Sequence, residues 1–154
     1  VRSSAASDVY KRQVDDTCLA TGELLAVKDT PFDFNKRKRI GQDLEADHIQ
    51  LKNAFGYDHS FVLNGTENQL TLEEPVSGRR LIISTTAPVV QVYTGNFLKD
   101  GCIGKAGRVY ENREGVALET QLMPNAINTE KNPSTILRKG DKFESNTKYV
   151  FEIM

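Results

Sequence analysis

The sequence predicts an all-β fold, an antiparallel β-sandwich, and three observations lead to it. From residue 60 onward, apolar and polar residues alternate with a period of two, as in strands that bury one face. The alternating runs are rich in β-branched and aromatic residues and are separated by Gly, Pro and Asn. Only residues 41–53 suggest a helix, and they follow helical spacing only roughly, so strands must supply most of the core.

The turn residues divide the strands in order along the chain. Asn64-Gly65 ends the first run, and Pro75 with Gly78 marks the next reversal. Ala87-Pro88 separates two β-rich runs and interrupts ladder pairing, so we expect a strand, a corner and a second strand there. The expected strands are residues 60–63, 69–72, 80–86, 89–96, 116–123 and 148–153.

Length and composition describe one globular domain. The 154 residues are 38% hydrophobic and 27% charged, a composition that is too apolar for a disordered chain. The chain is also long enough to form a hydrophobic core without disulfides or a structural metal. The net charge of -1 gives no broad positive field, so we expect neither nucleic acid nor an anionic lipid surface as a partner. The apolar runs are too short to span a membrane.

Cysteine and histidine usage argues against a metal site. The chain has two cysteines, Cys18 and Cys102, two histidines, and no CxxC or HExxH pattern, so no metal ligand set is expected. Without a secretory leader, two free thiols in a reducing compartment are the simpler interpretation, and we expect a cytoplasmic protein. A single disulfide between the two cysteines stays open.

Residues 1–13 show no strand or helix period and lack the apolar stretch of a signal peptide. We expect them to be a non-native or disordered flank outside the fold. The domain is then expected to occupy residues 14–154.

Alternation places polar side chains of three expected strands on one face each. In 116–123, Glu119 and Gln121 share a side with Ala117, so a carboxylate interrupts a semi-buried surface. In the run 89–96, Gln91 points to the same side as Tyr93. Around residue 60, Asp58 and Ser60 point away from His59 and Phe61. A sandwich leaves a concave face or rim on which such groups could meet a ligand.

Five motifs follow one another along the chain: TPFDF at 30–34, GYDHSFVL at 56–63, VQVYTGNF at 90–97, ALETQ at 117–121 and PNAIN at 124–128. In this order they resemble the motifs of the aldose 1-epimerase (galactose mutarotase) family. The resemblance spans about residue 15 to the C-terminus, and ILRKGD at 136–141 and YVF at 149–151 also fit.

The resemblance implies a galactose mutarotase-like supersandwich, here incomplete, that binds a hexose and interconverts its α and β anomers without a cofactor. It implies that Glu119, in the ALETQ motif, is the general base that takes the proton from the anomeric hydroxyl. Asp58, in the GYDH motif, would hold sugar hydroxyls, and Gln91 would line the same pocket.

The chemistry suits these residue types. Opening a cyclic hemiacetal requires removal of the O1 proton and delivery of a proton to the ring oxygen, after which rotation and closure invert the anomer. One carboxylate can act as the base while a second fixes the ring by accepting hydrogen bonds. Glu119 and Asp58 fit this division.

One departure from the family pattern limits the activity we expect. Family members carry their general-acid histidine in an NHSYFNL-like motif upstream of everything matched here, and this sequence has no such segment. His59 should face away from the sugar if Asp58 faces it, and His48 lies on the expected helix. We therefore interpret the chain as the C-terminal part of a single aldose 1-epimerase domain, with little activity of its own and a tendency to self-associate through exposed strand edges.

Other interpretations stay open. A non-catalytic carbohydrate-binding sandwich would keep the sugar-facing residues without turnover, and a hexose-6-phosphate 1-epimerase would need cations around the phosphate. The basic run 36–39 could suggest a phosphate or nucleic-acid patch, but acidic neighbours favour a solvated loop.

Overall fold

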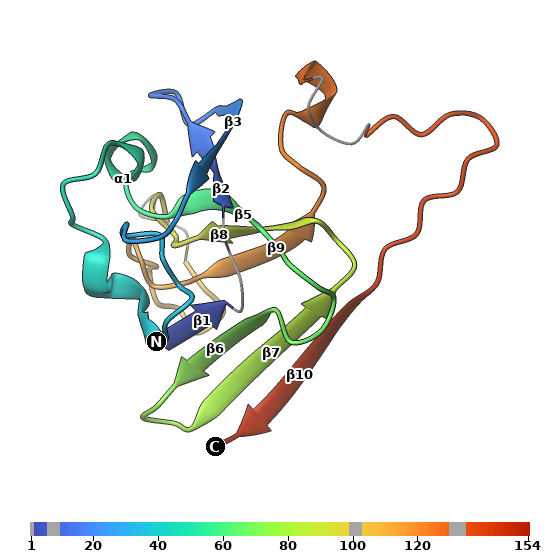
Figure 1. The fold of residues 1–154 in the computed structure, drawn as a ribbon. Coiled ribbons are helices and arrows are strands. Elements are labelled where there is room, and N and C mark those ends of the chain that lie inside the picture. Colours follow the sequence, from blue (N-terminus) through green and yellow to red (C-terminus); the bar gives the residue numbers. More distant parts are fainter. Residues whose placement is uncertain (1, 6–9, 99–102, 130–134) are drawn as a thin grey trace.

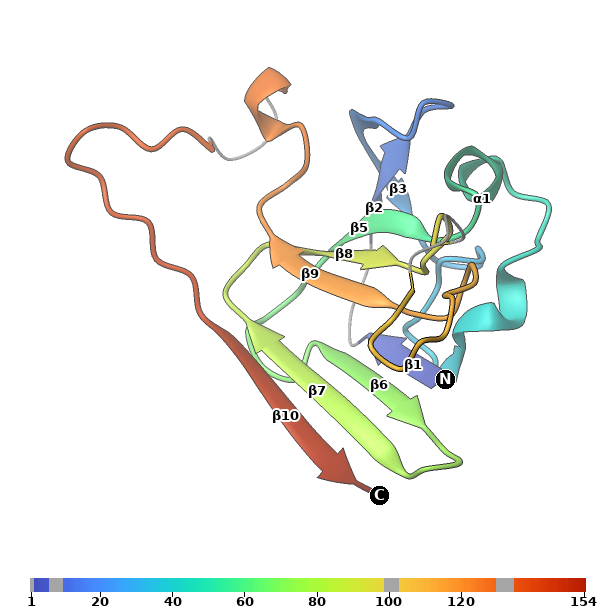
Figure 2. The same cartoon turned by 180° about the vertical axis from the view of Figure 1, so that it is seen from behind.

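The chain folds into two antiparallel sheets that face each other, which confirms the predicted all-β sandwich (Figure 1). The structure is a computed structural model that describes residues 2–5, 10–98, 103–129 and 135–154. The strands are β1 (Arg2–Ala5), β2 (Tyr10–Val14), β3 (Ala20–Ala26), β4 (Lys38–Arg39), β5 (Asp58–Val62), β6 (Leu70–Glu74), β7 (Arg79–Thr85), β8 (Val89–Tyr93), β9 (Ala117–Gln121) and β10 (Thr147–Ile153). One sheet has the order β10-β7-β6-β1-β4 and the other β3-β2-β5-β8-β9 (Figure 2).

The predicted corner at Ala87-Pro88 is where the chain passes from one sheet to the other. β7 ends at Thr85 in the first sheet and β8 begins at Val89 in the second. The Ala87 N–H donates to Thr85 Oγ1 at 3.1 Å, and Pro88, which has no N–H to give to a ladder, accepts the Leu63 N–H through its carbonyl at 3.0 Å. The corner lets two consecutive strands lie in different layers.

Alternating apolar side chains of both sheets meet between the layers. β7 and β8 supply Ile83, Val90 and Val92, and β5 supplies Phe61. Two aromatic residues of the TPFDF motif, Phe32 and Phe34, enter this core from a loop and contact the rings of Tyr57 and Phe61. The motif is therefore a packing element of the core.

A row of threonine hydroxyls connects the two sheets. Thr147 Oγ1 of β10 lies 2.8 Å from Thr85 Oγ1 of β7 and 3.0 Å from Thr120 Oγ1 of β9. Because β10 and β9 belong to different sheets, Thr147 ties the last strand of the chain to the strand that carries Glu119.

The expected helix at 41–53 is wrong as a single element. Two short helices occupy the region, the 3-10 helix η1 (Ile40–Asp43) and α1 (Ile49–Ala54). The chain turns between them, because the Ala46 N–H donates to Asp43 O and the His48 N–H donates to Ala46 O. His48 then caps α1 by accepting the Gln50 N–H at Nδ1, at 3.2 Å. A cap in the middle of the expected helix explains its division.

The structure departs from the expectation that residues 1–13 lie outside the fold. Tyr10–Val14 forms β2 between β3 and β5, and Lys11 and Arg12 are each only 1% exposed. Partners for the charge make this burial feasible: Lys11 Nζ donates to Gln50 Oε1 at 3.0 Å and lies 4.1 Å from the Phe32 ring centroid. That this segment is foreign to the native chain stays a prediction.

The basic run 36–39 is only in part the solvated loop that we expected, because Lys36, Arg37 and Arg39 are exposed but only residues 36–37 lie in a loop. Lys38 and Arg39 form β4, and Lys38 Nζ donates to Pro31 O at 2.6 Å and pairs with Asp43 at 2.7 Å. Arg37 pairs at 2.9 Å with Glu73, which is buried. The acidic neighbours therefore hold two of the four basic groups in place.

No helix in the described part of the chain is long and apolar enough to cross a membrane.

Candidate active site

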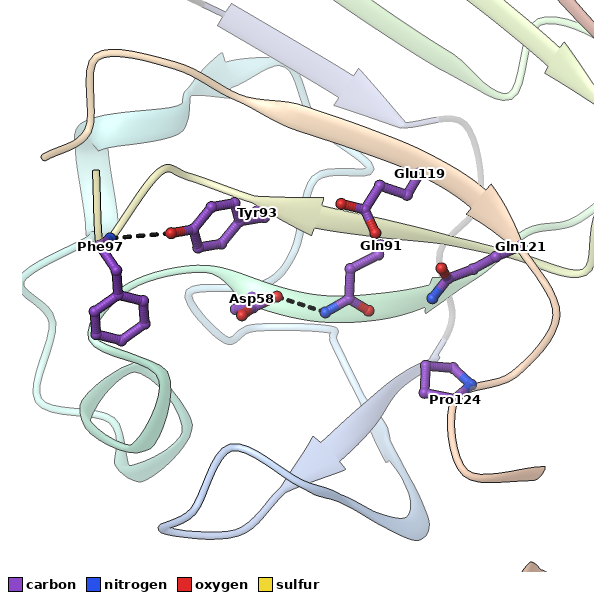
Figure 3. A pocket seen from close by; sticks show the side chains of 7 residues that line it. All are labelled: Asp58, Gln91, Tyr93, Phe97, Glu119, Gln121 and Pro124. Carbon is purple, nitrogen blue, oxygen red and sulfur yellow. Dashed lines mark hydrogen bonds between the residues drawn. The ribbon is translucent and has the colours of Figure 1, made fainter. Parts of the chain in front are cut away.

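An open hollow lies over the part of the second sheet that ends at β9 (Figure 3). Its volume is about 460 Å³. Three neighbouring strands, β5, β8 and β9, form its floor. The residues that line it are Asp58, Gln91, Tyr93, Phe97, Glu119, Gln121 and Pro124. The three site residues predicted from sequence, Asp58, Gln91 and Glu119, thus share one hollow.

Strand register explains why they meet. Gln91 of β8 lies directly opposite Glu119 of β9 on one side and Ser60 of β5 on the other. Tyr93, two residues further along β8, lies opposite Asp58. Residues opposite each other in antiparallel strands point to the same face, so these five polar side chains gather on one face.

Gln91 is held between two side chains of β5. Its Nε2 donates to Asp58 Oδ1 at 2.6 Å, and its Oε1 accepts a short hydrogen bond from Ser60 Oγ (Figure 3 shows the Asp58 bond). Glu119 is exposed and lies beside this pair across the β8–β9 ladder. The site therefore contains a fixed carboxylate–amide pair next to an open carboxylate.

Sequence analysis did not assign four lining residues, Tyr93, Phe97, Gln121 and Pro124. The Tyr93 hydroxyl accepts the Phe97 N–H at 3.0 Å, so it holds the loop after β8 against the hollow. The sequence did contain a signal for two of these residues. The period of two puts Tyr93 on the same face as Gln91, and Gln121 on the same face as Glu119. Phe97 and Pro124 lie in loops, where alternation predicts no direction.

Backbone contacts from three motifs fix the start of β5, and hence Asp58. The Tyr57 N–H donates to Thr94 Oγ1 at 3.1 Å, and Asn96 Nδ2 donates to Ala54 O at 2.8 Å and to Tyr57 O at 3.1 Å. The Tyr57 hydroxyl donates to Pro31 O at 2.7 Å, and burial raises the Tyr57 pKa. The motifs at 30–34, 56–63 and 90–97 therefore assemble around one turn.

Neither histidine lines the hollow, as expected for His59. The His59 side chain is 0% exposed and packs at 4.7 Å, centroid to centroid, against Phe32 on the core side of β5. Its Nδ1 accepts the Asp58 N–H at 3.1 Å, while the buried Nε2 has no hydrogen-bond partner in the described part of the chain. His48 caps α1 and contacts the Phe32 ring.

The buried His59 predicts a loss of stability in mild acid. Burial, then the charges of Lys11 and His48, lower its pKa from 6.5 to about 2. Below pH 6.5 the unfolded chain therefore binds a proton at His59 that the folded chain does not, and acidification favours unfolding. Between pH 7 and pH 5 we expect His59 to reduce the free energy of unfolding by about 2 kcal/mol.

Urea unfolding at both pH values measures this loss. His59→Asn, which keeps an acceptor for the Asp58 N–H, should unfold with a much smaller pH dependence. The control is His48→Asn, which keeps a helix cap and the buried His59 and should retain most of the dependence. An equal pH dependence in His59→Asn and in the unmodified chain would contradict the prediction.

The lining residues carry two carboxylates and no Lys, Arg or His. Among the described residues, no three His, Cys, Asp or Glu side chains gather as they would around a metal ion. Cys18 Sγ lies 3.1 Å from Asn53 O, and Cys102 falls outside the described residues, so their pairing stays open. The hollow offers mainly hydrogen-bond acceptors, with the Gln amides and the Tyr93 hydroxyl as donors.

Comparison with known proteins decides the family. The sequence model of the family described as aldose 1-epimerase matches residues 6–150. The chain belongs to the aldose 1-epimerase family. Galactose mutarotase of Homo sapiens is 38% identical over 143 residues, which cover 91% of this chain and 40% of that protein. Aldose 1-epimerase of Escherichia coli is 33% identical over 144 residues, 90% of this chain and 41% of that protein.

Solved structures of the family share the fold. An aldose epimerase homologue from C. elegans superposes with a TM-score of 0.86 at 30% identity, covering 99% of this chain and 45% of that one. Galactose 1-epimerase from Lactobacillus acidophilus gives a TM-score of 0.75 at 30% identity, covering 99% and 43%. The aldose 1-epimerase chain described here thus spans about two fifths of the length of the relatives it matches.

Proposed function

We propose that this chain is the base-carrying C-terminal part of an aldose 1-epimerase that interconverts the α and β anomers of a hexose. The observation that carries the proposal is the position of Glu119, an open carboxylate directly opposite Gln91 in the hollow that also contains Asp58. Family membership supports the same reaction.

In the proposed reaction, Glu119 takes the proton from the anomeric hydroxyl as the bond between C1 and the ring oxygen breaks. A proton reaches the ring oxygen from an acid, which leaves an open-chain aldehyde. Rotation about the C1–C2 bond and closure on the other face of the carbonyl give the other anomer, with Glu119 returning its proton to O1. Asp58 and Gln91 hold sugar hydroxyls and keep the ring in place.

The acid is the group that this chain does not place in its hollow. The lining residues include no histidine, and both histidines of the sequence have other positions, in the core and at a helix cap. We propose that in the intact enzyme the acid comes from a segment upstream of the matched motifs. No cofactor is needed, because both steps are proton transfers.

We predict that the chain alone accelerates anomer exchange of D-galactose little, and that imidazolium restores part of the rate. Imidazolium can enter an open hollow and deliver the missing proton while Glu119 acts as the base. Polarimetry of fresh α-D-galactose, with and without imidazole, measures the exchange, and the same imidazole without protein gives the background. Full family-like rates without imidazole, or no increment above background with it, would contradict the proposal.

Two alternatives are less well supported. A phosphorylated hexose would bring a dianion to a hollow whose lining residues include two carboxylates and no cation, which disfavours a hexose-6-phosphate 1-epimerase. A non-catalytic sugar-binding sandwich would bind galactose at the same place but show no increment with imidazole. We propose a cytoplasmic location for the enzyme.

We propose that the chain self-associates through the uncovered side of β10. Among the described strands β10 is one of the two edge strands of its sheet, and its alternate side chains Tyr149, Phe151 and Ile153 are 48%, 78% and 76% exposed. Unpaired backbone groups beside an apolar row favour pairing with another chain.

Sedimentation at increasing protein concentration should therefore show association. Phe151→Lys, which places a charge in the apolar row of β10, should weaken it by about tenfold. The control is Val76→Lys, since Val76 is 94% exposed but belongs to the β6–β7 turn and not to β10. A single monomeric species at all concentrations would contradict this prediction.

A further inference from the structure

The amide of Gln91 has two ends of nearly equal size, and the site depends on which end faces Asp58. An ionised carboxylate only accepts hydrogen bonds, so Asp58 requires the NH2 end of the amide. Nε2 accordingly donates to Asp58 Oδ1 at 2.6 Å (Figure 3). With the amide turned round, two acceptors would face each other and the contact would be repulsive.

Ser60 determines the other end of the same amide. Its side chain is only 2% exposed and lies opposite Gln91 in the β5–β8 ladder, two residues from Asp58 on the same face. Its hydroxyl makes the short hydrogen bond to Gln91 Oε1. Because Oε1 can only accept, the hydroxyl must donate, and the direction of the whole series is fixed from Ser60 through Gln91 to Asp58.

We propose that Ser60 is a positioning residue of the sugar site, an inference that rests on the proposed function. It holds the Gln91 amide so that Asp58 keeps one oxygen bonded to Gln91 and turns the other, which bonds no described residue, towards the hollow. The second N–H of Gln91 is then available to a sugar oxygen. The site then presents a hydrogen-bond acceptor, the second Asp58 oxygen, next to a donor, the second Gln91 N–H. This pair suits two neighbouring hydroxyls of an uncharged sugar.

The arrangement also distinguishes Ser60 from an ordinary buried serine. Loss of its hydroxyl would remove one of the two hydrogen bonds that hold the Gln91 amide, so that Asp58 alone would oppose its rotation about the terminal bond. Rotation of the amide would break its hydrogen bond to Asp58, and the Gln91 amide and the Asp58 carboxylate would then each adopt several orientations. Sugar affinity would fall although Ser60 itself does not line the hollow.

The test compares Ser60→Ala with Ser60→Thr, which keeps a hydroxyl, in the full 154-residue chain. NMR titration with D-galactose gives the dissociation constant, and the side-chain amide signals of Gln91, recorded without sugar, report its hydrogen bonding. Ser84→Ala is the matched control, because Ser84 is also a buried strand serine but its hydroxyl accepts the Asn68 N–H in the other sheet.

We expect Ser60→Ala to weaken galactose binding by about tenfold and to shift and broaden the Gln91 amide signals. Ser60→Thr should restore both, and Ser84→Ala should change neither. Unchanged Gln91 signals in Ser60→Ala, or an equal loss of affinity in Ser84→Ala, would overturn the inference. If the unmodified chain binds no galactose, the proposed function fails for this chain, while the amide signals still decide whether Ser60 orients Gln91.

Discussion

Glu119→Gln is expected to reduce the imidazole-dependent anomer exchange of D-galactose by 10²–10⁴-fold, the contribution typical of a positioned general base. Gln keeps the shape and polarity of the side chain but accepts a proton very poorly. Glu119 lies in the open part of the hollow and forms no hydrogen bond with the described residues, so its replacement should leave the fold intact. Polarimetry measures the rate, and thermal unfolding checks stability.

Sugar affinity separates a lost base from a lost binding group. The Asp58–Gln91 pair is undisturbed in Glu119→Gln, so the dissociation constant for galactose should change by less than about threefold. Glu67→Gln, an exposed loop substitution with the same loss of charge, is the control and should behave like the unmodified chain. A Glu119→Gln chain that retains the imidazole-dependent rate would rule out Glu119 as the base.

Gly56→Ala is expected to lower the free energy of unfolding by about 2–4 kcal/mol. Gly56 has a φ of 141°, a conformation that residues with a Cβ rarely adopt. An added Cβ would also overlap Asn96 Oδ1 and approach Thr94 Oγ1 at 3.1 Å. Both are hydrogen-bonded and buried, so neither can move without losing a contact that fixes Tyr57.

The control for Gly56→Ala is Gly65→Ala. Gly65 also has a positive φ, 71°, but an added Cβ there would meet nothing within 4 Å, so only conformational strain of about 1 kcal/mol is expected. Because Gly56 precedes Tyr57 and Asp58, its substitution should also weaken galactose binding. Equal unfolding free energies for the two variants would show that the Asn96 contact does not matter.

Alternation and turn residues were sufficient to predict most strands of the fold. The predicted strands 60–63, 80–86 and 89–96 correspond to β5, β7 and β8, and Ala87-Pro88 is the corner between the sheets. These signals are local and strong, since each face of a strand has one environment. The order of strands within each sheet was not predicted, because it depends on contacts between distant segments.

Buried charge is what sequence reasoning could not anticipate. Lys11 and Arg12 look like solvent-exposed residues in a segment without a period, yet both are buried, and Lys11 finds partners in Gln50 and the Phe32 ring. Charged side chains are rarely buried, and only the folded arrangement shows which partners make burial feasible.

The candidate site was predicted to the extent that its residues lie on strands. Glu119 and Gln91 were assigned through the family motifs, and the period of two gave the face on which they meet. Ser60 shares that face, but its role depends on a hydrogen bond to Gln91 that only coordinates reveal. Phe97 was not assigned because its place follows from the Tyr93 hydroxyl holding its N–H.

In the proposed reaction, the threonine row behind β9 would give β10 a part in positioning Glu119. Thr147 of β10 bonds Thr120, the neighbour of Glu119, on the side of β9 that faces away from the hollow. A base works only when it is held within a fraction of an ångström of its target. Under the proposed function, the contact from β10 would therefore limit the motion of Glu119, so that the position of the base would depend on a strand whose residues do not line the hollow.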